Sequence, residues 1–149
     1  MRFSSPRIFC VLVVAFLATW GGAVVAQEAT ISAPEANALA SRGQLTLVDV
    51  RTPDEWRKTG VPAGTKLVDL HNRGGQAAFL EQFIAAVGGD TSVPVAVICR
   101  TGSRSTQAQK LLMANGFTHV LNIKEGVMGS EAGPGWVNRG LPVTPCSTC

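Results

Sequence analysis

Short apolar runs alternate with helix-start signals between residues 32 and 123. The runs expected to form strands are 45–50, 66–70, 93–98 and 119–123. Helices are expected to begin at Ser32 and Thr52, to cover 77–87, and to follow the segment that ends at residue 105. Several strand runs are apolar throughout, which is typical of strands buried on both faces. The pattern therefore predicts an α/β fold whose parallel sheet is covered by helices on both faces.

Residues 1–26 carry the pattern of a leader and not of a folded element. Arg2 and Arg7 give a positive start, residues 8–20 are almost wholly apolar, and Val24 and Ala26 supply small residues for cleavage. We expect a signal peptide over 1–26, a mature chain that begins at Gln27, and a periplasmic location. The alternative is an uncleaved membrane anchor, since 8–25 reaches the length of about 18 residues needed to span a bilayer.

Charge and composition restrict the class of partner. The chain has 13 Lys and Arg against 10 Asp and Glu, and removing Arg2 and Arg7 leaves eleven cations, so the mature net charge is near +1. No basic stripe with interleaved aromatic residues occurs, which argues against nucleic-acid binding. His71 and His119 lack the spacing of metal ligands. We expect small-molecule partners, no metal and no cofactor.

The most informative stretch is Cys99-Arg100-Thr101-Gly102-Ser103-Arg104-Ser105, which joins an apolar strand run to a helical segment. A loop in this position directs backbone N–H groups and the positive end of the helix dipole at one point. These groups favour a thiolate over a thiol, so Cys99 is the expected nucleophile. The alternative is a buried structural cysteine at a strand end.

The charged and small residues of this loop have expected roles in binding an anion. Gly102 is expected to let the loop turn tightly. Arg104 is expected either to reach back to the loop or to pair with Asp49. Arg100 is the candidate for meeting an incoming anion, with a solvated surface charge as the alternative.

The hydroxyl side chains of the loop have two candidate uses. Thr101, Ser103 and Ser105 are all candidates for donating hydrogen bonds to the cysteine sulfur. Alternatively, Ser103 or Ser105 caps the following helix, and we favour capping for one of the two.

Asp49 and Arg51 follow the first strand run and are expected to support the site. Ligands of parallel sheets bind at the carboxyl ends of strands, where Asp49 and Cys99 both stand. One site can therefore contain both residues. A scaffolding role for Asp49 and Arg51 is preferred over a chemical one.

Three cysteines remain once Cys10 leaves with the leader. Cys146 and Cys149 can close on each other as a disulfide, which leaves Cys99 as the odd thiol. This Cys-x-x-Cys segment at 145–149 is interpreted as an inert or regulatory disulfide. The alternatives are a thiol pair that accepts sulfur from Cys99 and a redox site that faces a partner.

Three motifs in order resemble the single-domain rhodanese family: 47–56, with Asp-Val-Arg and an acidic-aromatic pair, the loop 99–105, and 135–143, which ends in Gly-Leu-Pro-Val. The resemblance implies a rhodanese-like domain over 27–144, with a central parallel sheet of about five strands and helices on both faces. It also implies sulfurtransferase activity with a persulfide on Cys99. Two segments depart from the family: 60–65 has Val61 where the family has histidine, and 124–135 looks expanded.

The expected reaction moves sulfane sulfur from thiosulfate or a similar donor to a thiophilic acceptor such as cyanide, a small thiol or a thiol protein. One rival is a cysteine phosphatase or arsenate reductase, whose motif has five residues between cysteine and arginine. This chain has four residues between Cys99 and Arg104, which suits a sulfur atom better than a tetrahedral phosphate. A second rival is a module that binds or carries persulfide without catalysis.

Overall fold

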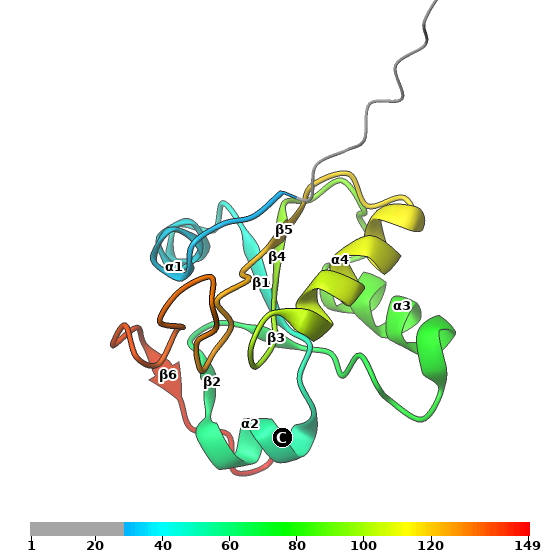
Figure 1. Ribbon diagram of the computed structural model, residues 1–149. Coiled ribbons are helices and arrows are strands. Elements are labelled where there is room, and N and C mark those ends of the chain that lie inside the picture. The colour runs from blue at the N-terminus through cyan, green and yellow to red at the C-terminus, as the bar shows by residue number, and fades with distance from the viewer. Residues whose placement is uncertain (1–28) are drawn as a thin grey trace, which may run out of the picture.

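The computed structural model describes residues 29–149, so the signal peptide expected over 1–26 lies outside the described residues (Figure 1). No helix within the described part has the length and apolar character that crossing a membrane requires. The helices are α1 (Ala33–Ser41), α2 (Pro53–Thr59), α3 (Gly75–Ala86) and α4 (Ser103–Ala114). The strands are β1 (Thr46–Asp49), β2 (Val61–Pro62), β3 (Lys66–Leu67), β4 (Val95–Ile98), β5 (Val120–Asn122) and β6 (Val143–Thr144).

The main sheet is parallel and has the strand order β3-β1-β4-β5, which confirms the predicted α/β class. It contains four strands where about five were expected. Beyond β5, Thr30 adds an isolated parallel bridge to Asn122 and does not form a further strand. The central pair places Asp49 of β1 beside Ile98 of β4. The two strand ends that carry the candidate chemistry are therefore neighbours.

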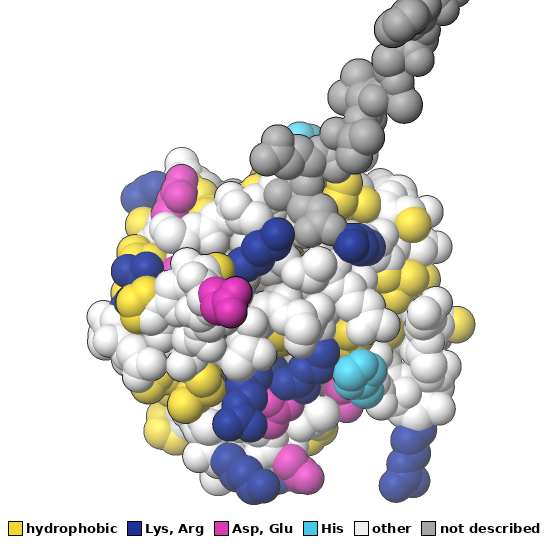
Figure 2. Space-filling model, viewed as in Figure 1, with side chains coloured by type: hydrophobic (Ala, Val, Ile, Leu, Met, Phe, Trp, Pro, Cys, Tyr) yellow, Lys and Arg dark blue, Asp and Glu magenta, His cyan; other side chains and the backbone are white. Residues whose placement is uncertain are grey.

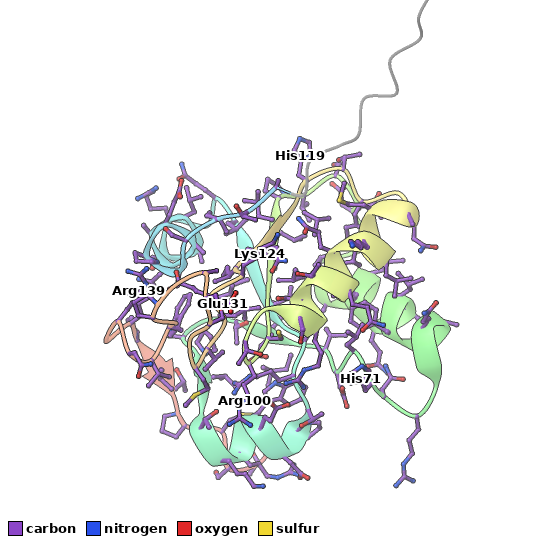
Figure 3. All side chains as sticks on the ribbon, in the orientation of Figure 1. His71, Arg100, His119, Lys124, Glu131 and Arg139 are labelled. Carbon is purple, nitrogen blue, oxygen red and sulfur yellow. A yellow bond between two sulfur atoms is a disulfide. The ribbon has the colours of Figure 1, made fainter. Side chains whose placement is uncertain are left out.

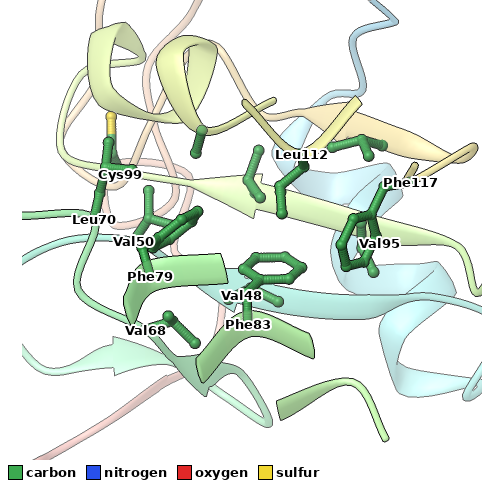
Figure 4. Packing of buried hydrophobic residues seen from close by; sticks show 13 residues of the cluster. Val48, Val50, Val68, Leu70, Phe79, Phe83, Val95, Cys99, Leu112 and Phe117 are labelled. Atoms are coloured by element: carbon green, nitrogen blue, oxygen red, sulfur yellow. The ribbon is translucent and has the colours of Figure 1, made fainter. Parts of the chain in front are cut away.

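Alternate residues of the central strands point to opposite faces, and both faces are buried. Val48 and Val97 pack on the face covered by α3 and α4, against Phe79, Phe83 and Leu112 (Figure 4). The residues on either side of them along the strands point to the opposite face of the sheet, where they pack with α1 and Trp136. These residues include Leu47, Ala96 and Ile98. This is the covering on both faces that uniformly apolar strands predict.

The first two helices begin where the sequence predicts. The Ser32 side chain accepts a hydrogen bond from the Glu35 N–H, and the Glu55 carboxylate accepts one from the Thr52 N–H. The expected serine cap of α4 is wrong, because Gly102 occupies the N-cap position with a φ of 98°. A left-handed backbone at that position suits glycine and strains a serine.

A separate two-stranded antiparallel sheet joins β2 to β6. Val61, which stands where the rhodanese family has histidine, is buried in β2 and pairs with Thr144. Gly60 precedes it, and a Cβ there would lie 2.7 Å from a Val143 side-chain carbon. The segment after α2 is therefore packed directly against the segment that leads to the two terminal cysteines.

Candidate active site

Cys99 follows β4 directly and lies at the end of the hydrophobic cluster. Its sulfur points away from the aromatic rings of the core toward the start of α4 (Figure 4). The Gly102 N–H donates a hydrogen bond to Cys99 Sγ, with an N–S distance of 3.1 Å. The residue is 1 % exposed, so the sulfur lies at the bottom of the loop and not on its rim.

Two glycines fix the backbone around this sulfur. A Cβ on Gly102 would lie 2.2 Å from the Lys124 carbonyl oxygen, and one on Gly126, whose φ is also positive, would lie 2.4 Å from the Arg100 carbonyl oxygen. The Val127 N–H donates to the Cys99 carbonyl at 2.8 Å. The expanded segment 124–135 therefore forms a backbone wall against the cysteine loop, and it reaches that position only because both contacts involve glycine.

The hydroxyl groups of the loop are directed elsewhere than the sulfur. Ser105 Oγ and Thr106 Oγ1 both donate to the Gly102 carbonyl, at 3.0 and 2.9 Å. Ser105 is completely buried in this arrangement. Thr101 and Ser103 line a hollow of about 380 Å³ beside the 124–135 segment. Among the described residues no hydroxyl group hydrogen-bonds to the sulfur, and the donor to Cys99 Sγ is the Gly102 N–H.

Arg104 pairs with Glu55 of α2, so the alternative pairing with Asp49 is wrong. Its two terminal nitrogens donate to the two carboxylate oxygens at 2.5 and 2.7 Å. The Arg104 hydrogen bonds hold the pKa of Glu55 down to about 2, although partial burial opposes this shift. The same bonds raise the pKa of Arg104, and the nearby Cys99 sulfur adds to that shift. The start of α4 is thereby tied to α2 by a bidentate ion pair.

Asp49 and Arg51 form a buried ion pair, with 0 % and 1 % exposure. Arg51 Nε and Nη2 donate to the Asp49 carboxylate, which also accepts the Arg51 backbone N–H. The guanidinium continues to Thr59 Oγ1 at 2.7 Å and to the Gly60 carbonyl at 2.8 Å. This pair therefore connects the strand end beside Cys99 to the last turn of α2.

A cationic hollow of about 190 Å³ opens between the cysteine loop and α2. It is lined by Arg51, Glu55, Lys58, Thr59, Arg100 and Met128. Figure 2 shows Lys and Arg side chains gathered over this part of the surface, and Figure 3 shows Arg100 over α2. Within the described residues, neither Lys58 nor Arg100 has a side-chain ion pair or hydrogen bond. Both charges are therefore available to an anion.

Glu125 is a site-supporting residue that sequence reasoning missed. Its nearly buried carboxylate accepts the N–H groups of Ala33 at 2.7 Å and Gly135 at 2.9 Å, and pairs with Arg139 at 2.6 Å. Burial raises the pKa of Glu125, but these three donors outweigh it and place the pKa below its usual value. An acidic residue in a loop gives no sequence signal of this kind, because its partners lie 10, 14 and 92 residues away, beyond any local motif.

His119 lies away from this arrangement, and the described hydrogen bond of His71 runs from its backbone N–H to the Asp69 carboxylate. Figure 3 places His119 at the end of the domain opposite Arg100, where its Nδ1 lies 2.9 Å from Thr118 Oγ1. Within residues 29–149 no three His, Cys, Asp or Glu side chains are grouped so as to hold a metal ion.

The fold and the site define an α/β domain whose parallel sheet is buried on both faces. Its cysteine loop connects a central strand to a helix. The model of the rhodanese-like domain matches residues 32–132, and the chain belongs to that family. The match contains the cysteine loop and all four strands of the main sheet.

Three proteins named as sulfur transferases are similar to this chain. A sulfurtransferase of Allochromatium vinosum is 30 % identical, over 70 % of this chain and 83 % of its own. Thiosulfate sulfurtransferase 16 of Arabidopsis thaliana is 35 % identical, over 64 % of this chain and 76 % of its own. The polysulfide-sulfur transferase of Wolinella succinogenes superposes with a TM-score of 0.57 at 33 % identity, covering 80 % of both chains. The family and these relatives support sulfurtransferase-type activity.

Proposed function

We propose that this chain is a rhodanese-type enzyme that takes sulfane sulfur from thiosulfate or a similar donor. The Cys99 thiolate attacks the outer sulfur of the donor and forms a new S–S bond. The S–S bond of thiosulfate breaks, and sulfite leaves with the electron pair. Cys99 then carries a persulfide, as in other two-step mechanisms that use a covalent intermediate.

The second step returns the cysteine to its starting state. A thiophilic acceptor, such as cyanide or a thiolate, attacks the outer sulfur of the persulfide. The persulfide S–S bond breaks, and Cys99 leaves as the thiolate. The Gly102 N–H, at the start of α4, lies 3.1 Å from the sulfur that carries the negative charge before and after the reaction, and the positive end of the helix dipole lies on the same side.

The observation that carries the proposal is the Gly102 N–H hydrogen bond to Cys99 Sγ in a loop held by glycine contacts. Donors fixed before the reaction need no reorganisation when charge develops on sulfur. Arg100 and Lys58 supply positive charge in the cationic hollow, which suits the approach of an anionic donor. Asp49, Arg51 and Arg104 act as positioning residues for the loop, while Arg100 is the proposed contact to substrate.

Intact mass measurement tests the proposal on protein with its tail disulfide left oxidised. After thiosulfate treatment, wild type gains the mass of one sulfur atom on Cys99, and the Cys99→Ser variant gains none. Addition of cyanide removes the added sulfur and yields thiocyanate. A wild type that gains no sulfur contradicts the proposal and favours a binding module. Aryl phosphate hydrolysis that depends on Cys99 favours the phosphatase rival.

We also propose that residues 1–26 direct export and are removed before Gln27. The support is the positive start at Arg2 and Arg7, the apolar run and the small residue Ala26. N-terminal sequencing of the protein from a periplasmic fraction is expected to begin at Gln27. An intact leader found in the membrane fraction contradicts this proposal.

A further inference from the structure

Cys146 and Cys149 form a second sulfur site that the proposed function does not use. The structure joins their sulfurs as a disulfide, with Cα atoms 5.5 Å apart. Both residues are half-buried, whereas Ser147 and Thr148 between them are exposed. Cys99 is the one free cysteine among residues 29–149. The described chain therefore contains one buried single thiol and one accessible sulfur pair.

The tail, residues 145–149, rests on the same helix that borders the active site. Figure 1 shows the chain leaving β6 and ending against α2, where Arg57 donates to the Cys149 carbonyl. A tail hollow of about 310 Å³ lies here, lined by Arg57, Lys58, Thr59, Gly60, Val143, Pro145, Cys146 and Ser147. Lys58 and Thr59 also line the cationic hollow next to the cysteine loop. The tail hollow and the cationic hollow thus adjoin at the C-terminal end of α2.

The tail is held much more loosely than the cysteine loop. Its nearest regular element is β6, which is two exposed residues long and pairs with β2. Five residues, 145–149, follow Thr144, and an extended segment of that length spans about 17 Å. Reduction of the disulfide removes the covalent closure of the tail. Cys149 has the longer reach of the two thiols, because Cys146 is two residues from the end of β6.

We propose that the reduced tail is a sulfur acceptor for Cys99, and this rests on the proposed function. The Cys149 thiolate attacks the outer sulfur of the Cys99 persulfide; the persulfide S–S bond breaks, and Cys99 leaves as thiolate. Cys149 then carries the persulfide. The Cys146 thiolate attacks Cys149 Sγ, expels hydrosulfide, and closes the Cys146–Cys149 disulfide. The two thiols are oxidised by two electrons, the sulfane sulfur is reduced to sulfide, and the thiol protons pass to solvent and hydrosulfide.

The disulfide observed in the structure is the product state of this sequence. An external dithiol, by thiol–disulfide exchange at the accessible pair, returns the tail to its reduced state. Lys58, which lines both hollows, and Arg100 of the cationic hollow supply positive charge, which favours thiolates. With such a dithiol present, the chain converts sulfane sulfur to sulfide and needs no cyanide or small-thiol acceptor.

The test uses reduced, desalted protein mixed with one equivalent of thiosulfate and no added acceptor. Wild type is expected to release one sulfide per chain and to regain the tail disulfide. The Cys149→Ser variant and the double variant Cys146→Ser, Cys149→Ser are expected to keep the sulfur on Cys99 and to release roughly tenfold less sulfide. The Cys146→Ser variant is expected to place the sulfur on Cys149, as located by peptide mass after alkylation.

The outcomes separate this inference from the proposed function. Sulfur that stays on Cys99 in reduced wild type, as in the double variant, overturns the tail transfer while leaving sulfur loading intact. Absence of sulfur from Cys99 in every variant overturns the proposed function itself. Dilution of the protein at a fixed, saturating thiosulfate concentration separates two routes: a first-order rate constant of sulfide release that is independent of protein concentration supports transfer within one chain, and a rate constant that rises with protein concentration overturns it.

Discussion

The Cys99 loop and the Cys146–Cys149 tail both present sulfur, but the chain holds them in opposite ways. Cys99 lies between a central strand and a helix, with glycine contacts and two ion pairs around it. The tail follows a two-residue strand and contacts α2 through exposed Arg57. A nucleophile that must meet preformed N–H donors needs a rigid support. A sulfur pair that exchanges with partners needs access and freedom to move.

The largest difference in activity is expected between removing the sulfur of the cysteine loop and removing the two sulfurs of the tail. Cys99→Ser should lower thiosulfate:cyanide sulfurtransferase activity by at least about 10³-fold, because the nucleophile is lost. The double variant Cys146→Ser, Cys149→Ser should retain that activity, since cyanide replaces the tail as acceptor. Steady-state thiocyanate formation measures both. Equal losses in the two variants would contradict the division of roles.

Replacing one glycine by alanine in each region compares how tightly the two backbones are held. Gly102→Ala places a Cβ 2.2 Å from the Lys124 carbonyl oxygen, so the loop must shift, and activity should fall about 10²-fold. Gly140→Ala, on the side that leads to β6, meets nothing within 4 Å at a φ of 68°. That variant should cost about 1 kcal/mol in unfolding free energy for the left-handed backbone and leave activity unchanged. An active Gly102→Ala enzyme would show that the loop tolerates displacement.

Charge removal compares the ion pairs of the two regions. Asp49→Asn leaves Arg51 charged and buried, and should lower the free energy of unfolding by about 3–5 kcal/mol. Asp54→Asn breaks the exposed pair with Arg57 beside the tail and should cost less than about 1 kcal/mol. Urea unfolding at neutral pH measures both changes. Similar costs for the two variants would mean that burial does not set the strength of these pairs.

The last comparison concerns Glu55 and acid. Its pKa falls from 4.5 to about 2 in the folded chain, because Arg104 hydrogen bonds to the carboxylate. A folded pKa below the unfolded one stabilises the native state above pH 4.5, and this stabilisation is lost as the pH falls toward 2. The stability difference between wild type and Glu55→Gln should therefore shrink over that interval in urea unfolding. A difference that stays constant with pH contradicts the assigned role of the ion pair.

Local patterns predicted most of the elements and the cysteine loop. Ser32 and Thr52 begin helices as their capping patterns indicate, and the apolar run 93–98 contains β4. The neighbouring positions of Asp49 and Cys99 also followed from a general property of parallel sheets. These features depend on residues within one turn or one strand. The prediction of a serine cap for α4 was wrong. A serine next to a glycine gives the same local sequence pattern whether the serine or the glycine occupies the N-cap position.

The sequence by itself determined the α/β alternation, the buried strands and the position of the thiol between strand and helix, since each depends on local periodicity and spacing. Only the tertiary structure decided that Arg104 binds Glu55, that Glu125 gathers Ala33, Gly135 and Arg139, and that the tail meets α2. These partners lie far apart along the chain. Long charged side chains reach several candidates, so the packed backbone selects among them, and no pattern of residues encodes that choice locally.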